Sequence, residues 1–254
     1  MDGITFDIPL FLFATFAGAF VAGLSGFAFG LVAASLWLYI LTPVQSATLI
    51  VAFGLLVQGY SVWKLRQALD WERLWPFIAG AALGVPLGVM LLTWSDPRSV
   101  RIAIGVILVL YSLYALFRPA LKLSGDGRMS NGAIGFLNGV LGGVTGLAGI
   151  LVTIWCNLRG WPKDGQRTVF QPVAVVVFLM SAIWLGAKGT VTAETAKFFV
   201  MGLPCLLAGT WLGLVWDNRG SDFPENRAGA SVHLGSHVDD LRRLTAEAAA
   251  RLFE

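Results

Sequence analysis

The sequence contains few charged residues, few cysteines and few histidines. Only 13% of its 254 residues are Asp, Glu, Lys or Arg, whereas an ordinary soluble domain has roughly 25%. Hydrophobic residues make up 56%, and the mean hydropathy is +0.73. A soluble core of this length could not bury so much apolar surface. The composition excludes a soluble enzyme, a disordered chain and a nucleic-acid-binding protein, and it indicates a protein that crosses the bilayer several times.

The scarce reactive residues also argue against a catalytic site. Cys156 and Cys205 lie in apolar runs without metal-site spacing, and we interpret them as packed small hydrophobic residues. Both histidines, His233 and His237, lie in the polar C-terminal segment. The apolar stretches contain no Asp, Glu, Lys, Arg or His to supply an acid, a base or a ligand. We therefore expect no enzyme activity, no metal, no cofactor and no nucleic-acid partner.

Six stretches without charged residues mark the expected membrane segments, because a helix needs about 20 apolar residues to cross a bilayer. They cover residues 8–63, 74–95, 102–117, 129–158, 168–187 and 198–216. The first is too long for one helix, so we expect two short helices that turn at Ser25–Gly26, then a break at Thr42–Pro43. The glycine-rich fourth stretch predicts a second hairpin that turns near Thr145–Gly146. The sequence leaves open whether these hairpins cross the membrane fully or re-enter on the same side.

The predicted helices of the first hairpin are residues 8–24 and 27–41, and those of the second are 129–145 and 147–158. With this layout, 14 of the 18 Lys and Arg residues fall on one side of the membrane and four on the other. Basic residues concentrate on the cytoplasmic side, so we expect the N-terminus outside and the C-terminal tail inside. No Lys or Arg precedes the first apolar run, so we interpret that run as a permanent span rather than a signal peptide.

The two hairpins resemble each other in sequence. Residues 23–28, Gly-Leu-Ser-Gly-Phe-Ala, align with residues 143–148, Gly-Val-Thr-Gly-Leu-Ala, at an offset of 120. Because three crossings separate the hairpins, the second half starts from the opposite side of the membrane. We therefore predict an all-α integral membrane protein, a polytopic helical bundle of two inverted-topology repeats over residues 1–120 and 129–216. A chance match between glycine-rich segments is the alternative.

Glycines also predict close helix packing, through stripes at every fourth residue. Residues 80, 84 and 88, residues 135 and 139, and residues 209 and 213 form such stripes. The glycines of the two hairpin turns differ, because they cluster where a helix must break. A broken helix is tolerated in a membrane only where it lines a protein-enclosed or wet cavity, and the free N–H groups of the next helix suit an anion.

We therefore predict a site for a small anion at the two breaks. The candidate substrate-binding residues are Ser25, Gly26, Asn138, Thr145, Gly146 and Gln171. Gln171 precedes Pro172 at an expected kink. Asn138 and Gln171 are therefore better candidates for the site than Gln58. A hydrogen bond between helices is the alternative role for each amide. Arg167 is the nearest positive charge, although a topology marker is its favoured interpretation.

The paired motifs resemble those of the sulfite exporter TauE/SafE family of membrane transporters. The resemblance rests on Gly18 with Gly23-Leu-Ser-Gly26-Phe-Ala-Phe-Gly30, and on the segment from Gly135 to Gly146, and it covers roughly residues 6–216. It implies a multi-pass permease of the plasma membrane, of the bacterial inner-membrane type, with two inverted halves. Family members are associated with sulfite, sulfonates and related organosulfur anions. We expect such an anion and the lipid bilayer as partners, and the sequence leaves a homo-oligomer open.

Two features depart from the family pattern. Ile150 follows Gly149 where a proline is common, and residues 217–254 are polar where the family has a further apolar span. This tail has 12 charged residues among 38, and leucines at helical spacing predict a short amphipathic helix over residues 234–252. The second repeat therefore appears in the sequence without its last span. A non-transporting or truncated accessory subunit is the alternative to a transporter.

Overall fold

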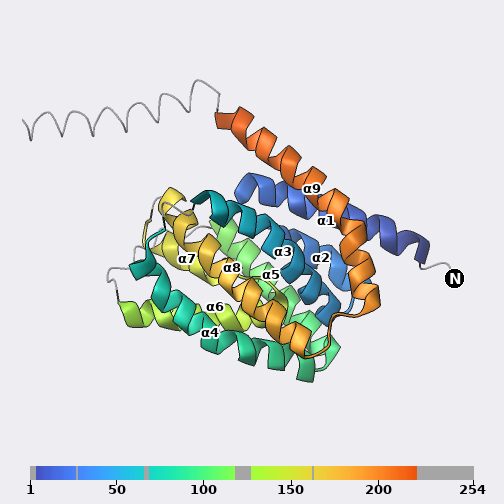
Figure 1. Ribbon diagram of the computed structural model, residues 1–254, viewed down its shortest axis with the longest axis horizontal. Helices are drawn as coiled ribbons and strands as arrows, with labels where there is room; N and C mark the ends of the chain where they lie inside the picture. Colours follow the sequence, from blue (N-terminus) through green and yellow to red (C-terminus); the bar gives the residue numbers. More distant parts are fainter. Residues whose placement is uncertain (1–3, 27, 66–68, 118–126, 162, 222–254) are drawn as a thin grey trace, which may run out of the picture. The chain divides into compact units, whose positions relative to one another are not determined.

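A computed structural model describes residues 4–26, 28–65, 69–117, 127–161 and 163–221. Within these ranges the chain forms nine α-helices and no β-strand (Figure 1). The helices are α1 (Ile4–Ser25), α2 (Phe29–Ile40), α3 (Pro43–Leu65), α4 (Trp71–Trp94), α5 (Pro97–Phe117), α6 (Arg128–Thr145), α7 (Ile150–Leu158), α8 (Lys163–Ala187) and α9 (Ala193–Ser221). Residues up to Gly213 form one compact unit, and every contact below lies within it. Residues 222–254, with the amphipathic helix expected over 234–252, lie outside the described residues.

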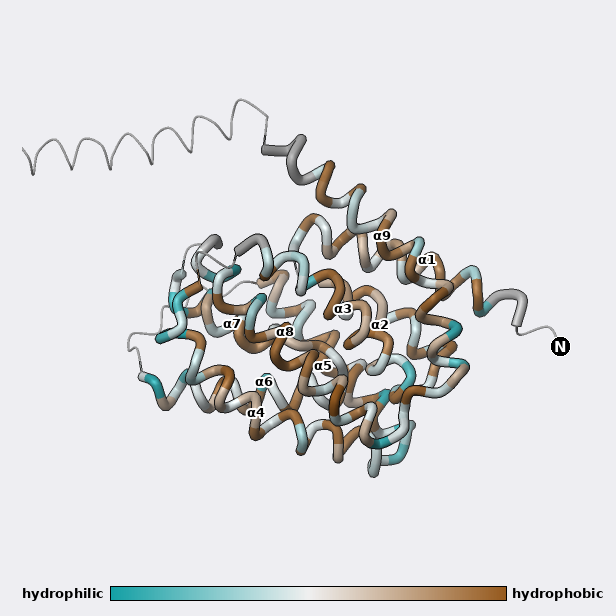
Figure 2. Tube along the Cα trace, viewed as in Figure 1, coloured by the Kyte–Doolittle hydropathy of each residue, from teal (hydrophilic) through white to brown (hydrophobic). Residues whose placement is uncertain are grey.

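Six helices are long and apolar enough to cross a membrane, namely α1, α3, α4, α5, α8 and α9. Figure 2 shows that hydrophobic residues dominate along the helices, whereas hydrophilic residues gather at helix ends and connections. α8 begins at Lys163 and α9 at Ala193, each five residues before the charge-free stretch that predicted it. Charged side chains at a helix end extend to the membrane surface, so the helix continues past the apolar stretch.

The helices break where the sequence predicted. The first break separates α1 from α2, between Ser25 and Phe29, and the second separates α6 from α7, between Thr145 and Ile150. Gly26 and Gly146 each follow the end of a helix with left-handed backbone angles, φ 85° and φ 73°. A left-handed residue at this position ends a helix, and glycine adopts it without steric cost. Pro172, where the sequence predicted a kink, lies inside the helix α8.

Glycines bring α4 and α6 into backbone contact, as the stripes predicted. A Cβ atom added at Gly139 would lie 2.6 Å from Ala81 O, and one added at Gly143 would lie 2.7 Å from Val85 O. Figure 1 shows the two helices side by side. Close approach of backbones through small residues is the usual way in which membrane helices associate, because lipid supplies no hydrophobic drive between helices.

The same backbone contacts occur between α9 and α1. Four contacts share one pattern, in which a glycine lies against a backbone carbonyl oxygen: Gly84 on Phe136, Gly88 on Val140, Gly209 on Phe16 and Gly213 on Phe20. The partners in α6 follow those in α1 by 120 residues, and the glycines of α9 follow those of α4 by 125. Each hairpin therefore packs its first helix against a glycine helix from the other half of the sequence.

Candidate functional site at the two helix breaks

Ser25 and Gly26 form the first break through backbone hydrogen bonds. Gly26 N donates to Ala22 O at 2.7 Å. Ser25 Oγ donates to Val21 O at 2.8 Å and accepts from Ala28 N at 3.3 Å. The serine hydroxyl thus bonds the last turn of α1 on one side and the connection to α2 on the other.

Thr145 and Gly146 repeat this arrangement at the second break. Gly146 N donates to Gly142 O at 2.8 Å. Thr145 Oγ1 donates to Leu141 O at 2.7 Å and accepts from Leu147 N at 2.9 Å. The sequence predicted both hydroxyls as donors toward an anion. In this conformation each hydroxyl donates to a backbone carbonyl of its own helix.

The N-cap residues of the short helices that follow the breaks, Ala28 of α2 and Gly149 of α7, make no side-chain cap hydrogen bond. Their own N–H groups donate to Ser25 Oγ and Asn138 Oδ1, respectively. The first N–H groups of a helix have no partner within the helix, and the helix dipole makes this end electropositive. Each break therefore places backbone donors and a partial positive charge inside the protein.

Asn138 connects α6 to the second break. Its side chain is fully buried at 0% exposure, and Oδ1 accepts from Gly149 N at 3.0 Å. Its other polar atom, Nδ2, is buried and finds no hydrogen-bond partner among the described residues. A buried polar group without a partner costs about 1–3 kcal/mol. Asn138 therefore fixes the turn with one end of its amide and offers a donor with the other.

Gln171 and Arg167 bring α8 to the first break. Gln171 is 4% exposed, and Nε2 makes a long contact of 3.5 Å with Gly26 O. Its Oε1 atom is buried and without a partner in the described part of the chain. A Cβ atom added at Gly26 would lie 3.1 Å from Gln171 Nε2 and 4.0 Å from Arg167 Nε. The sequence favoured a topology marker for Arg167, but the fold places its guanidinium beside the break.

The two breaks contact each other in the protein interior. A Cβ atom added at Gly30, near the start of α2, would lie 2.8 Å from Leu147 Cδ2 and 2.9 Å from Ile50 Cγ2. One added at Gly146 would lie 3.0 Å from Ile50 Cβ. Ile50 of α3 thus packs against both breaks. The structure gathers Ser25, Gly26 and Gln171 at the first break and Asn138, Thr145 and Gly146 at the second.

A model of the sulfite exporter TauE/SafE family matches residues 10–221. The chain belongs to this family. The match extends from α1 to the end of α9 and includes both breaks. Together with the six apolar helices, it makes the chain a multi-pass membrane protein of a transporter family. Neither the curated proteins nor the solved structures yield a match.

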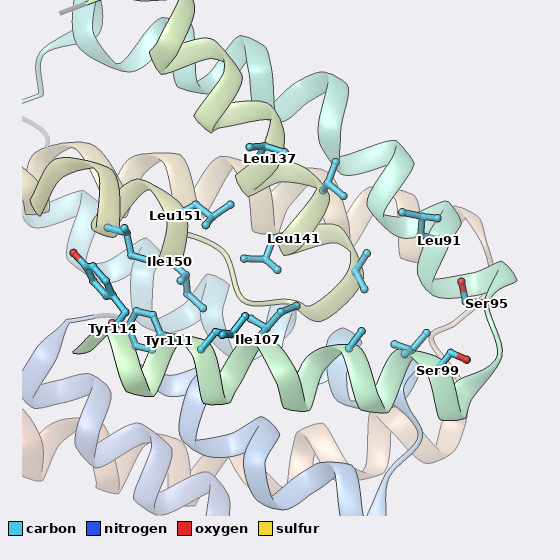
Figure 3. A pocket seen from close by; sticks show the side chains of 16 residues that line it. Leu91, Ser95, Ser99, Ile107, Tyr111, Tyr114, Leu137, Leu141, Ile150 and Leu151 are labelled. Carbon is cyan, nitrogen blue, oxygen red and sulfur yellow. The ribbon is translucent and has the colours of Figure 1, made fainter. Parts of the chain in front are cut away.

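A second feature of this TauE/SafE protein is an apolar groove beside α5. It has a volume of about 660 Å³ and is lined by residues of α4, α5, α6 and α7. Figure 3 shows side chains such as Leu141, Ile107 and Leu151 pointing into it, with Ser95 and Ser99 at one end. An anion needs donors that replace its water, and this lining is almost entirely hydrocarbon. The groove therefore does not suit an anion, and the breaks remain the candidate site.

Proposed function

We propose that the protein is a secondary transporter of small anions, with sulfite, sulfonates and related organosulfur anions as its substrate class. Membership of the TauE/SafE family supports the class of activity. The observation that carries the proposal is the contact between the two glycine breaks, each with a buried amide beside it. Helix breaks that meet near the middle of the membrane are the usual binding sites of secondary transporters.

Two inverted-topology repeats, residues 1–120 and 129–216, supply the machinery. Ser25 and Thr145 each donate to the carbonyl oxygen four residues earlier, which supports this division. The glycine contacts, offset by 120 and 125 residues, support it as well. Transport then requires one repeat to rock against the other, so that the breaks open alternately to each side. The distribution of basic residues supports a plasma-membrane protein of the bacterial inner-membrane type, with the N-terminus outside and the tail inside.

The anion binds between the breaks when they separate. The first turns of α2 and α7, whose N-cap residues make no side-chain cap hydrogen bond, supply N–H groups, and Asn138 Nδ2 supplies a side-chain donor. Rotation of the Gln171 amide turns its NH₂ group toward the anion at the expense of only a 3.5 Å contact. Arg167 contributes the positive charge. Ser25 and Thr145 keep the breaks in shape, so they act on the site through the backbone.

Efflux of labelled sulfite and a labelled sulfonate from proteoliposomes tests the proposal. Arg167→Gln removes the positive charge at the first break, and we expect it to raise KM about tenfold, the effect of one lost charge-assisted hydrogen bond. Arg98→Gln is the matched control, because Arg98 is exposed at the start of α5. Absence of flux for every anion in the wild-type protein would refute the proposed function. Equal KM values in the two variants would remove Arg167 from the site.

A further inference from the structure

Gln58 is a buried amide that the site described above does not use. It lies in α3, is 4% exposed, and its Oε1 atom has no hydrogen-bond partner among the residues described. It lines a cavity of about 10 Å³, which is close to the space that one water molecule occupies. The other lining residues are apolar or glycine: Ala22, Phe29, Gly30, Ile50, Gly54, Val57 and Phe178.

Phe178 of α8 forms one wall of this cavity. A Cβ atom added at Gly54 would lie 2.6 Å from Phe178 Cε2 and 2.7 Å from Cζ, so the ring lies directly on the glycine backbone. Phe178 is itself buried. Only a residue without a side chain lets the ring approach α3 so closely, and this approach leaves the cavity too small for an anion.

The cavity adjoins the contact between the two breaks. Gly30 and Ile50 line it, and the same two residues meet Leu147 and Gly146 of the second break. Ala22 lines it as well, and its carbonyl oxygen accepts from Gly26 N at the first break. Separation of the breaks therefore moves the walls of this cavity and enlarges it.

We propose that Gln58 is a further anion-binding residue, which the substrate reaches when Phe178 moves off Gly54. This inference rests on the proposed function and extends the same site. Gln58 Oε1 has no hydrogen bond to lose within the described residues, so rotation of the amide to present its NH₂ group to an anion breaks no bond of that oxygen. Burial of the unsatisfied oxygen also disfavours the closed state, whereas in the enlarged cavity water donates to the oxygen and an anion accepts from the NH₂ group. The passage to Gln58 is thus closed when Phe178 lies on Gly54 and open when Phe178 has moved away.

Thiol labelling tests the movement without any assumption about the substrate. Gln58→Cys is made in a background with both free cysteines replaced, as Cys156→Ala and Cys205→Ala. We expect a membrane-impermeant methanethiosulfonate to label position 58 at least about tenfold faster when Phe178→Ala or Phe178→Leu is added. Phe53→Ala is the control, because this buried aromatic residue contacts Gly202 and does not line the cavity. Equal labelling with and without the Phe178 substitutions, or equal acceleration by Phe53→Ala, overturns the inference.

Substrate binding at Gln58 has its own readouts. Methanesulfonate should slow labelling of the Phe178→Leu variant, and a sulfonate is used because sulfite reacts with the reagent. Gln58→Leu, which keeps the side-chain volume, should raise KM for sulfite about tenfold while the protein keeps its thermal stability in detergent. A more stable Gln58→Leu with unchanged KM would mean that Gln58 contacts only a trapped water, and would overturn the anion role. If Phe178→Leu accelerates labelling but no anion is transported, the proposed function fails and the movement of Phe178 stands.

Discussion

Asn138→Asp separates two roles of Asn138, its observed hydrogen bond at the second break and its proposed binding of the anion. Oδ1 accepts from Gly149 N at 3.0 Å, whereas Nδ2 is buried and finds no partner in the part of the chain described. Aspartate has almost the same shape and keeps an oxygen toward Gly149 N. It replaces the NH₂ donor by a second oxygen. The fold of the turn should survive while the donor to the anion is lost.

The expected size of the effect follows from that single donor. A hydrogen bond to a charged group contributes about 1.5–3 kcal/mol, which corresponds to roughly a 10- to 150-fold change in affinity. The ionised carboxylate has no hydrogen-bond donor for the anion and also repels it. We therefore expect KM for sulfite to rise at least about tenfold, with little change in the melting temperature of the protein in detergent.

The assay is sulfite efflux from proteoliposomes, with KM and the maximal rate measured separately. Asn157→Asp is the matched control, because it replaces the same amide by a carboxyl group at an exposed position outside the break. Asn157 Nδ2 donates to Tyr114 Oη at 3.0 Å. Asn138→Asp with the KM of the wild type would refute the reasoning. A large loss of thermal stability would show that the Gly149 hydrogen bond, rather than the anion, requires the amide.

Three further pairs of substitutions, each a test with its control, examine the packing and the breaks. Gly84→Ala should prevent correct assembly of α4 on α6, because its Cβ meets Phe136 O, whereas Gly105→Ala in open space should leave folded yield unchanged; equal yields would contradict the packing. Gly26→Ala and Gly189→Ala should each lower the stability measured by thermal unfolding by about 1–2 kcal/mol, because both glycines have a positive φ. Only Gly26→Ala should lower flux, because a Cβ atom there lies 3.1 Å from Gln171 Nε2. Thr145→Val should lower stability by about 1–3 kcal/mol, because Leu147 N loses its acceptor, whereas Thr145→Ser keeps the hydroxyl and should not. A raised KM in a stable Thr145→Val protein would instead show that the hydroxyl binds the anion.

The helix breaks were predictable because the information is local. Membrane helices tolerate glycine clusters, but a run such as Gly142-Gly143 followed by Gly146 and Gly149 supplies the left-handed backbone that a turn needs. The family was predictable from the same segments. The boundaries of α8 and α9 were less accurate, because the absence of charge marks the apolar core of a span rather than the end of its hydrogen-bonded helix.

The neighbours of the breaks depend on the tertiary fold, so the sequence could name candidate residues without placing them. Gln171 lies against Gly26 although 145 residues separate them, and no local pattern specifies that pairing. For Ser25 and Thr145, the sequence showed hydroxyls near a turn, but a hydroxyl at a helix end bonds equally well to the carbonyl four residues earlier. Arg167 satisfied the rule for topology markers, and that rule carries no information on which break a side chain reaches.

Both breaks have a left-handed glycine after their first helix, but their neighbours differ, and this difference bears on how the proposed anion is held. Gln171 and Arg167 of α8 adjoin the first break, whereas Ile50 of α3 packs on both breaks. The second break has Asn138 from its own hairpin instead. Neither break alone therefore combines a charge, the electropositive start of a helix and a donor that is free in the described structure. Only both breaks together supply that set, so their contact in the interior matters more for anion binding than the glycines of either one.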